Sequence, residues 1–274
     1  MKPRTLIALA AAFVLAGVGL AIDFGGLSKA MDGLNKAKKV KEDVDDVKTL
    51  VSDVSPEEEQ ALGDSVALEI ISRYGGLVRD PAMMRRVNLV GRGLVRYSSR
   101  PDNHWRFGVL NSDTVNAFSA PDGYVFISRG LYKLADTDDA LAGVLGHEIS
   151  HITGRDAIRI IGNSKKGSII TRHAAEHSSD LRQVQAAAQQ LDVSVDKIIQ
   201  TLFDKGYSTT TEYAADKNGH DLAATTGYAP GGLRSVLKVL QARGGETKKV
   251  FPSHPPLAER IQRLPDDPAP APAS

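Results

Sequence analysis

The sequence predicts an α+β fold that is mainly helical, with a small β-sheet beside one long apolar helix. Several stretches carry apolar residues at spacings of three and four, which is the period of an amphipathic helix. A central stretch, 105–128, instead contains three short segments typical of strands, separated by turn residues. The composition, 42% hydrophobic and 24% charged, is that of an ordinary globular protein, so we expect these elements to share one core.

The N-terminal residues 1–21 have the pattern of a signal peptide. Lys2 and Arg4 precede an apolar run from Leu6 to Leu20. This run of 15 residues is shorter than the roughly 20 that a spanning helix needs, which favours cleavage. An extension of the run to Ile22 leaves an uncleaved N-terminal anchor as the alternative. In both cases we expect the rest of the chain to be exported to the periplasm or cell envelope.

Residues 22–54 are polar, with apolar residues spaced as in an amphipathic helix, and predict a helical arm. The arm either packs on the domain that follows or binds a membrane surface or a partner. At the other end, 265–274 has four prolines in ten residues and predicts a disordered tail. The folded domain is therefore expected to span 55–264.

Two helices are expected to open this domain. Ser55, Pro56 and the three glutamates after them provide an N-cap, a proline at the first helical position and negative charge at the positive end of a helix. This helix is predicted to run to Tyr74, and a second one covers 83–97. Both are expected to serve as scaffold.

The β-rich stretch predicts strands at 105–110, 115–119 and 124–128, the last two joined by strong turn residues. The residues 136–139, with three aspartates and a threonine, then supply a cap and a negative first turn for a long apolar helix that runs through Ile152. We expect the sheet to lie beside this helix.

Charge and cysteine content exclude several classes of function. Lys and Arg total 34 against 33 Asp and Glu, so the strong basic bias of a nucleic-acid-binding protein is missing and nucleic acid is not an expected partner. The chain has no cysteine, which excludes disulfides, thiolate catalysis and cysteine-based metal sites. A transition metal would have to be bound by histidines and carboxylates.

Three residues of the long apolar helix, His147, Glu148 and His151, form the pattern H-E-x-x-H. At about 100° per residue the two histidines lie only some 40° apart around the helix, so both imidazoles can bind one ion. Glu148 falls among apolar positions of the helix, where an unpaired carboxylate is costly. The pattern predicts a Zn²⁺ site in which Glu148 has a water molecule as its partner.

A second pattern, H-x-x-E-H at His173, Glu176 and His177, is the reverse of the first. Its neighbours are polar and charged, without the apolar residues that would bury it. We therefore interpret it as the solvated surface of a helix.

Catalytic zinc usually has three protein ligands and one open position, so a third donor is expected elsewhere in the chain. We predict Glu212, which lies 61 residues after His151 at the start of a helix over 212–224. The small residues Ala215 and Gly219 allow this helix to pack closely on the first. Asp216 shares the face of Glu212 and could accept the second N–H of a zinc-binding histidine.

Together these motifs resemble the HtpX-like zinc peptidases, and in particular their exported BepA-like branch. These peptidases are gluzincins with the motifs H-E-x-x-H and E-x-x-A-D, and they are related to the CAAX prenyl endopeptidases. The resemblance covers about 56–264 and includes Asn116–Phe118 and the S-H-P-P sequence at 253–256. Asp122 stands where the family often has glycine. The membrane-embedded members have a long apolar segment between the two metal-binding helices; this chain lacks one, which favours a soluble zincin-like domain.

The resemblance implies a zinc-dependent metalloendopeptidase that hydrolyses peptide bonds of unfolded or misassembled envelope proteins. Glu148 would activate a zinc-bound water by taking its proton and would pass that proton to the leaving amine. If the strand 124–128 is an edge beside the cleft, it could pair with an extended substrate. Outer-membrane assembly proteins are a second class of expected partner.

Two further residues are expected to act in catalysis, His254 and Asp216. His254 could steady the oxyanion, donate a proton or occupy the open metal position; the alternative is a loop histidine fixed by the two prolines that follow it. The family implies a proton donor at Asp216, whereas its place on the helix favours support of a ligand. His104 and His220 are interpreted as structural, although His220 lies one turn after Asp216 and so within reach of the site.

The alternative function is that of a periplasmic chaperone or assembly factor with little or no proteolysis. In that protein the same cleft and amphipathic segments would bind clients. The two hypotheses differ in the effect of Glu148→Gln, which abolishes cleavage by a peptidase but leaves a binding protein active.

Overall fold

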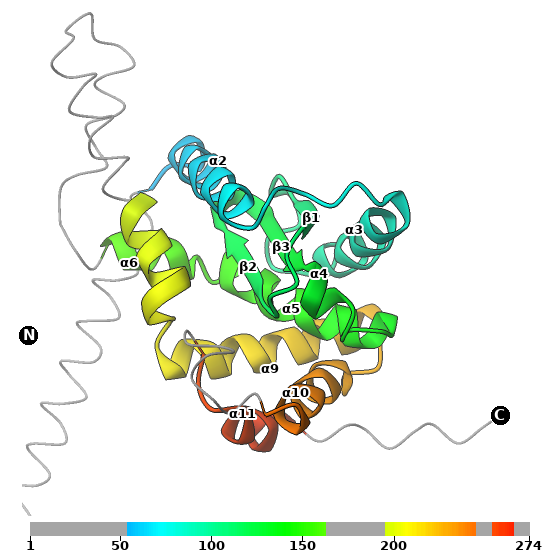
Figure 1. Ribbon diagram of the computed structural model, residues 1–274. Coiled ribbons are helices and arrows are strands. Elements are labelled where there is room, and N and C mark those ends of the chain that lie inside the picture. The colour runs from blue at the N-terminus through cyan, green and yellow to red at the C-terminus, as the bar shows by residue number, and fades with distance from the viewer. Residues whose placement is uncertain (1–53, 163–194, 245–253, 266–274) are drawn as a thin grey trace, which may run out of the picture. The chain divides into compact units, whose positions relative to one another are not determined.

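The computed structural model describes residues 54–162, 195–244 and 254–265, which form a mainly helical α+β fold around a three-stranded sheet (Figure 1). The predicted fold class is confirmed. Several predicted segments lie wholly or almost wholly outside the described residues: the signal segment 1–21, the arm 22–54, the H-x-x-E-H pattern at 173–177 and the tail 265–274.

The first two helices begin at side-chain caps. Helix α2 (Pro56–Arg73) starts with a capping box: Ser55 Oγ accepts the N–H of Glu58 at 3.2 Å, and the Glu58 carboxylate accepts the N–H of Ser55 at 2.9 Å. Helix α3 (Pro81–Val95) starts two residues before its predicted position, because Asp80 caps it by accepting backbone N–H groups.

The sheet has the order β1-β3-β2. Strand β1 (Arg106–Leu110) pairs parallel with β3 (Tyr124–Ser128), and β2 (Ala117–Ala120) pairs antiparallel with it. The condition under which the strand 124–128 could pair with a substrate is not met, because the tight turn before it folds β2 against one side of β3 while β1 pairs along the other side. Strands β1 and β2 are therefore the two edges of this sheet.

The turn between β2 and β3 is the short helix η1 (Pro121–Gly123). Asp122 has φ 61° there, in the left-handed region that aspartate tolerates better than most residues. Its carboxylate also contacts His104 Nδ1 at 3.0 Å, which gives His104 a structural partner. The turn thus accommodates an aspartate in a left-handed conformation.

Helix α5 (Asp138–Thr153) runs through the centre of the fold, after the short helix α4 (Arg129–Tyr132). Thr137 caps α5 by accepting the N–H of Ala140 at 3.1 Å. Every residue from Ala140 to Ile152 is buried. The helix is therefore enclosed by other elements on all sides, as the predicted apolar pattern requires.

The described part of the C-terminal half contains further helical elements. They are the π-helical turn η2 (Thr201–Lys205), α9 (Thr209–Thr226), α10 (Gly232–Ala242) and α11 (Leu257–Arg263). Helix α6 (Asp156–Gly162) precedes them and follows α5 directly. Helix α9 lies against α5 at two glycines. A Cβ atom on Gly219 would lie 2.6 Å from the backbone nitrogen of His147, so only glycine permits this approach. The predicted close packing of the two helices is confirmed.

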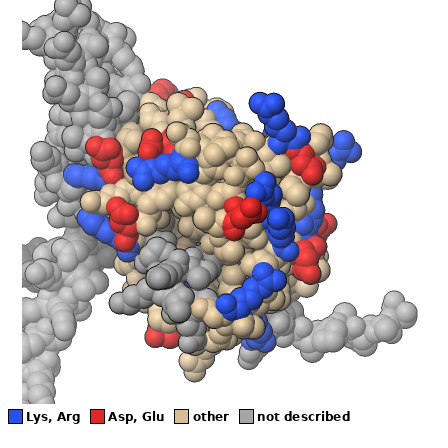
Figure 2. Space-filling view, in the orientation of Figure 1, with Lys and Arg blue, Asp and Glu red and all other residues tan. Residues whose placement is uncertain are grey.

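Apolar side chains cover both faces of the sheet. One cluster joins β-strand residues such as Val109 and Ile127 to α3, α5 and α10, and the other joins Phe118 and Phe126 to α2. None of the helices in 54–162, 195–244 and 254–265 is long and apolar enough to cross a membrane. Figure 2 shows acidic and basic side chains interspersed on one face of the molecule.

Candidate metal centre

Two imidazoles converge near the C-terminal end of α5. His147 and His151 are one helical turn apart, their rings meet edge to face with centroids 4.7 Å apart, and their Nε2 atoms are separated by 3.2 Å. Both side chains are almost fully buried. The H-E-x-x-H spacing therefore brings two nitrogen lone pairs to one point.

The carboxylate of Glu212 faces the same point from the first turn of α9. Its Oε2 lies 3.6 Å from His147 Nε2, and its Oε1 lies 3.6 Å from His151 Nε2. Glu212 is completely buried, and its Oε1 has no hydrogen-bond donor among the described residues. A buried carboxylate oxygen without a donor is costly, so a cation at this point would satisfy it.

The other ring nitrogen of each histidine contacts a carboxylate. His147 Nδ1 lies 2.8 Å from Asp216 Oδ1, and His151 Nδ1 lies 2.9 Å from Asp156 Oδ2. A carboxylate at Nδ1 favours a proton there and leaves Nε2 free to bind a metal. Two imidazole nitrogens and one carboxylate form the donor set of a catalytic zinc site, so these residues fit the predicted ion.

The charges around the centre keep Glu212 ionised. Burial alone would raise the pKa of this carboxyl, but the neighbouring imidazoles, first that of His254, lower it to about 2. Burial lowers the pKa of His147, which favours its neutral form. An ionised carboxylate beside a neutral imidazole suits a divalent cation.

A buried arginine, Arg260 of α11, contacts Asp216 and His147 beside the metal centre. Its Nε and Nη2 atoms donate to the two oxygens of Asp216 at 2.9 and 2.6 Å, and Nη2 lies 3.4 Å from His147 Nδ1. This bidentate pair holds the pKa of Asp216 well below its usual range, although burial works in the opposite direction. Arg260 was given no role from the sequence, because it is 113 residues from His147.

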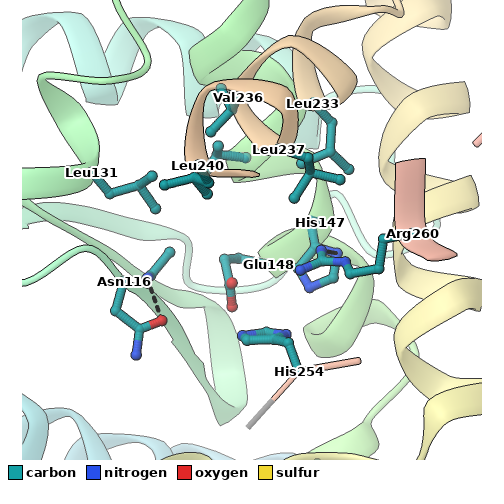
Figure 3. A pocket seen from close by; sticks show the side chains of 12 residues that line it. Asn116, Leu131, His147, Glu148, Leu233, Val236, Leu237, Leu240, His254 and Arg260 are labelled. Atoms are coloured by element: carbon teal, nitrogen blue, oxygen red, sulfur yellow. Dashed lines mark hydrogen bonds between the residues drawn. The ribbon is translucent and has the colours of Figure 1, made fainter. Parts of the chain in front are cut away.

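Glu148, the predicted proton acceptor, is buried and lines the same pocket as His147 (Figure 3). His254 faces this pocket from the other side. Its Nδ1 lies 2.5 Å from Glu212 Oε2, and ligand atoms of His147, Glu212 and His254 lie within 4.8 Å of one another. The structure thus brings His254 beside His147 and Glu212.

Two other residues near the centre have structural contacts. Tyr207 stacks on the ring of His151 at a centroid distance of 4.5 Å and holds that imidazole from one side. It follows Gly206, whose φ of 72° turns the chain out of η2. His220 is buried, and its Nδ1 lies 3.1 Å from Asp221 Oδ1.

Residues 81–267 of the chain match the family model described as Peptidase family M48. Curated relatives carry protease names. The β-barrel assembly-enhancing protease of Escherichia coli (strain K12) is 26% identical over 190 residues, which are 68% of this chain and 39% of that protein. The mitochondrial metalloendopeptidase OMA1 of Schizosaccharomyces pombe is 26% identical over 227 residues, covering 78% of this chain and 62% of OMA1.

A third relative is the metalloprotease YcaL of Escherichia coli (strain K12), 28% identical over 161 residues, which are 58% of this chain and 61% of YcaL. The chain spans only about two fifths of the length of the assembly-enhancing protease that it matches. The match includes the whole of the metal centre, because His147, His151, Glu212 and Arg260 all lie within 81–267.

Proposed function

The chain belongs to peptidase family M48, and from this membership we propose that it is a zinc-dependent metalloendopeptidase that cleaves unfolded or misassembled proteins of the cell envelope. The observation that supports this most strongly is the convergence of two imidazole nitrogens on a buried carboxylate that has an oxygen without a hydrogen bond. The names of two relatives, a metalloendopeptidase and a metalloprotease, also support a metal-dependent peptidase.

In this proposal His147, His151 and Glu212 hold the ion. A zinc ion at this point would activate water as a nucleophile near neutral pH and polarise the scissile carbonyl. Asp216 and Asp156 hold the two imidazoles in the required tautomer through their Nδ1 atoms. Asp216 thus acts as a positioning residue, since both of its oxygens are already bonded to Arg260.

Glu148 moves the proton. It accepts a proton from the attacking water as the water oxygen bonds to the carbonyl carbon, and it then donates that proton to the amine nitrogen as the C–N bond breaks. Its burial beside His147 supports this role, because a carboxylate in a site from which water is largely excluded has few competing partners.

The edge strand β2 offers main-chain groups to an extended substrate. The N–H of Ser128 on β3 donates to Asn116 O, so the backbone groups of Ala117 and Ser119 point away from β3, to the side of β2 on which none of the described residues forms a strand. On that side the Ala117 N–H donates to Asn116 Oδ1 at 2.9 Å. Ala117 lines the cavities on both sides of Glu148. Main-chain pairing of this kind accepts many sequences but requires an extended segment, which explains a preference for unfolded proteins.

The proposed location in the periplasm or cell envelope depends on the N-terminal pattern at 1–21, which lies outside the described residues. Relatives named for β-barrel assembly fit a role in the envelope. The second candidate function, an assembly factor with little or no cleavage, is supported by the same name.

Casein hydrolysis by the purified chain, with metal content determined on the same samples, tests the proposal. We expect the wild type to cleave and the Glu148→Gln variant to hold about one zinc per chain with cleavage reduced at least about 100-fold, since it lacks the proton acceptor. Glu69→Gln on α2 is the matched control, because the partner of Glu69 among the described residues is Arg73, in an exposed ion pair. Metal-loaded wild type that suppresses aggregation without cleaving casein would favour the assembly factor.

The variant His254→Ala in the same assay separates the alternatives for His254. If the imidazole occupies the open metal position, its removal should increase casein cleavage at unchanged zinc content. If it steadies the oxyanion or donates a proton, cleavage should fall roughly 100- to 10,000-fold instead. The contact of His254 with Glu212 supports the first alternative.

A further inference from the structure

A buried carboxylate on α2, that of Glu59, takes no part in the proposed chemistry. Glu59 is 2% exposed, and glutamate is almost never buried to this degree unless it is paired. Arg100 makes a bidentate contact with it, Nη1 to Oε1 at 2.7 Å and Nη2 to Oε2 at 3.1 Å. Arg155 Nη2 lies 2.9 Å from the same Oε2. Two arginines from distant parts of the chain therefore meet on one carboxylate.

Both arginines also contact groups at the end of α5 or just beyond it, where the metal-binding histidines lie. Arg100 Nη1 donates to Ile152 O at 3.4 Å, in the last turn of the helix. Arg155 lies just beyond that end, and its Nη2 also donates to Val54 O at 2.9 Å, directly before α2 and its cap. The Glu59 cluster, which we define as Glu59, Arg100 and Arg155, thus joins α2 to the C-terminal end of α5.

Arg155 needs such support because its backbone conformation is unfavourable. Its φ of 54° lies in the left-handed region, where the Cβ atom of any residue other than glycine crowds the backbone. Residues in this region persist when the surrounding structure determines their conformation. The contacts of the guanidinium with Glu59 and with Val54 O hold the side chain and so stabilise the turn.

The turn at Arg155 places the next residue, Asp156, at the metal centre. Asp156 Oδ2 lies 2.9 Å from His151 Nδ1, while the other ring nitrogen of His151 faces Glu212. Glu59, Arg155 and His151 also line one small pocket together. A change in the backbone of Arg155 would move the Asp156 carboxylate away from the imidazole, because the two residues are adjacent.

We propose that the Glu59 cluster is a positioning device for His151 that acts through Arg155 and Asp156. The cluster holds the left-handed turn, the turn places the Asp156 carboxylate, and the carboxylate fixes the ring that binds the ion. Glu59 precedes the segment 81–267 that matches the family, so α2 contributes to a metal centre whose ligands all lie within that segment. The inference rests on the proposed metallopeptidase function and adds residues on which its site depends.

Zinc affinity, measured by competition with a chromophoric chelator, tests the proposal. Glu59→Gln removes the charge that holds Arg155, and we expect zinc to bind about tenfold more weakly, at the lower end of the range for groups that support a ligand. Glu69→Gln, the same change at an exposed position of α2, is the control and should bind zinc like the wild type. Equal affinities of the two variants would overturn the proposal.

A double-mutant cycle with Asp156→Asn separates positioning from a merely structural effect. Asp156→Asn alone should weaken zinc binding by about 10- to 100-fold, because it removes the carboxylate at His151. If Glu59 acts through Asp156, adding Glu59→Gln to this variant should change the affinity by less than about twofold. Independent effects would multiply instead, so a further loss of about tenfold in the double variant would contradict the proposal.

Arg155→Ala tests the same contacts without leaving a buried charge unpaired, since Glu59 keeps its bidentate contact with Arg100. This variant decides the question if Glu59→Gln does not fold. We expect a loss of zinc affinity of about tenfold, and Arg155→Lys, which keeps a cation near Glu59, should recover part of it. If Arg155→Ala bound zinc as tightly as the wild type, the cluster would not position His151.

The Nδ1 proton of His151 provides a readout that needs neither zinc nor cleavage. Its NMR signal is identified by its loss in Asp156→Asn, and its exchange with water should be at least about tenfold faster in Glu59→Gln than in Glu69→Gln. If the wild type cleaves nothing but this order holds, the peptidase function fails and the cluster assignment stands. If cleavage occurs while exchange and zinc affinity are the same in both variants, only the cluster assignment fails.

Discussion

At the scale of single residues, the metal centre depends on groups that hold the ligands as much as on the ligands themselves. Arg260 holds Asp216 with two hydrogen bonds, and Asp216 in turn contacts Nδ1 of His147. This chain of contacts joins α11 through α9 to α5. It fixes the ring of one predicted ligand before any metal binds.

Replacement of Asp216 by asparagine should therefore weaken the site without removing a ligand. An amide is a poorer acceptor for the Nδ1 proton of His147, so we expect zinc affinity to fall about 10- to 100-fold. Competition with a chromophoric chelator would measure the change. Asp221→Asn, on the exposed side of the same helix, is the control and should bind zinc like the wild type. Equal affinities for the two variants would mean that Asp216 does not support His147.

The sequence could predict the residues whose spacing is set by one helix, but not those brought together by folding. His147, Glu148 and His151 follow from the helical period, and Glu212 from the need for a third ligand and a helix with small residues. Asp156 contacts His151 only because Arg155, with φ 54°, turns the chain back after α5. Arg260 follows the S-H-P-P sequence in the pattern that resembles the family, but the pattern does not give its role, since a buried arginine cannot be distinguished from an exposed one in a short amphipathic helix.

At the scale of elements, caps and turns were predictable and strand order was not. Ser55 and Thr137, which lie in predicted caps, each begin a helix through contacts within three residues, whereas the cap at Asp80 was not predicted. The order β1-β3-β2 depends on a parallel pairing between segments separated by a turn and another strand, which alternation of side chains does not specify. The sequence therefore does not reveal that 124–128 lies at the centre of the sheet, where it cannot pair with a substrate.

The crossing of α5 and α9 is the contact between elements on which the site depends most. Gly219→Ala would place a Cβ atom 2.6 Å from the backbone of His147, so the helices must separate. We expect a loss of about 1–3 kcal/mol in the free energy of unfolding and weaker zinc binding, because Glu212 moves with α9. Urea denaturation followed by circular dichroism would measure the first effect.

Gly93→Ala on α3 is the matched control for this substitution. Its added Cβ atom meets nothing closer than 3.7 Å, and alanine is the better helix former, so we expect unchanged or slightly greater stability. If both variants lost the same stability, the close approach of α5 and α9 would not be the cause.

At the scale of the whole molecule, the metal centre connects parts of the chain that are far apart in sequence. His147 and His151 come from α5, Glu212 from α9, and the supporting Arg260 from α11. A ligand that binds only the folded protein stabilises it by mass action, in proportion to the logarithm of its free concentration over Kd. Zinc should therefore contribute to the stability of the entire fold as well as to its chemistry.

Removal of the metal by a chelator should accordingly lower the melting temperature, and added zinc should restore it. At free zinc about 1,000 times Kd the stabilisation is about 4 kcal/mol, which corresponds to roughly 8–16 °C for a domain of this size. Differential scanning calorimetry would compare three proteins. The wild type and Glu148→Gln should both show the full shift, because Glu148 is proposed to move a proton and not to bind the ion. Glu212→Gln removes the charged ligand and should show little of it, so a full zinc-dependent shift in that variant would rule out Glu212 as the third ligand.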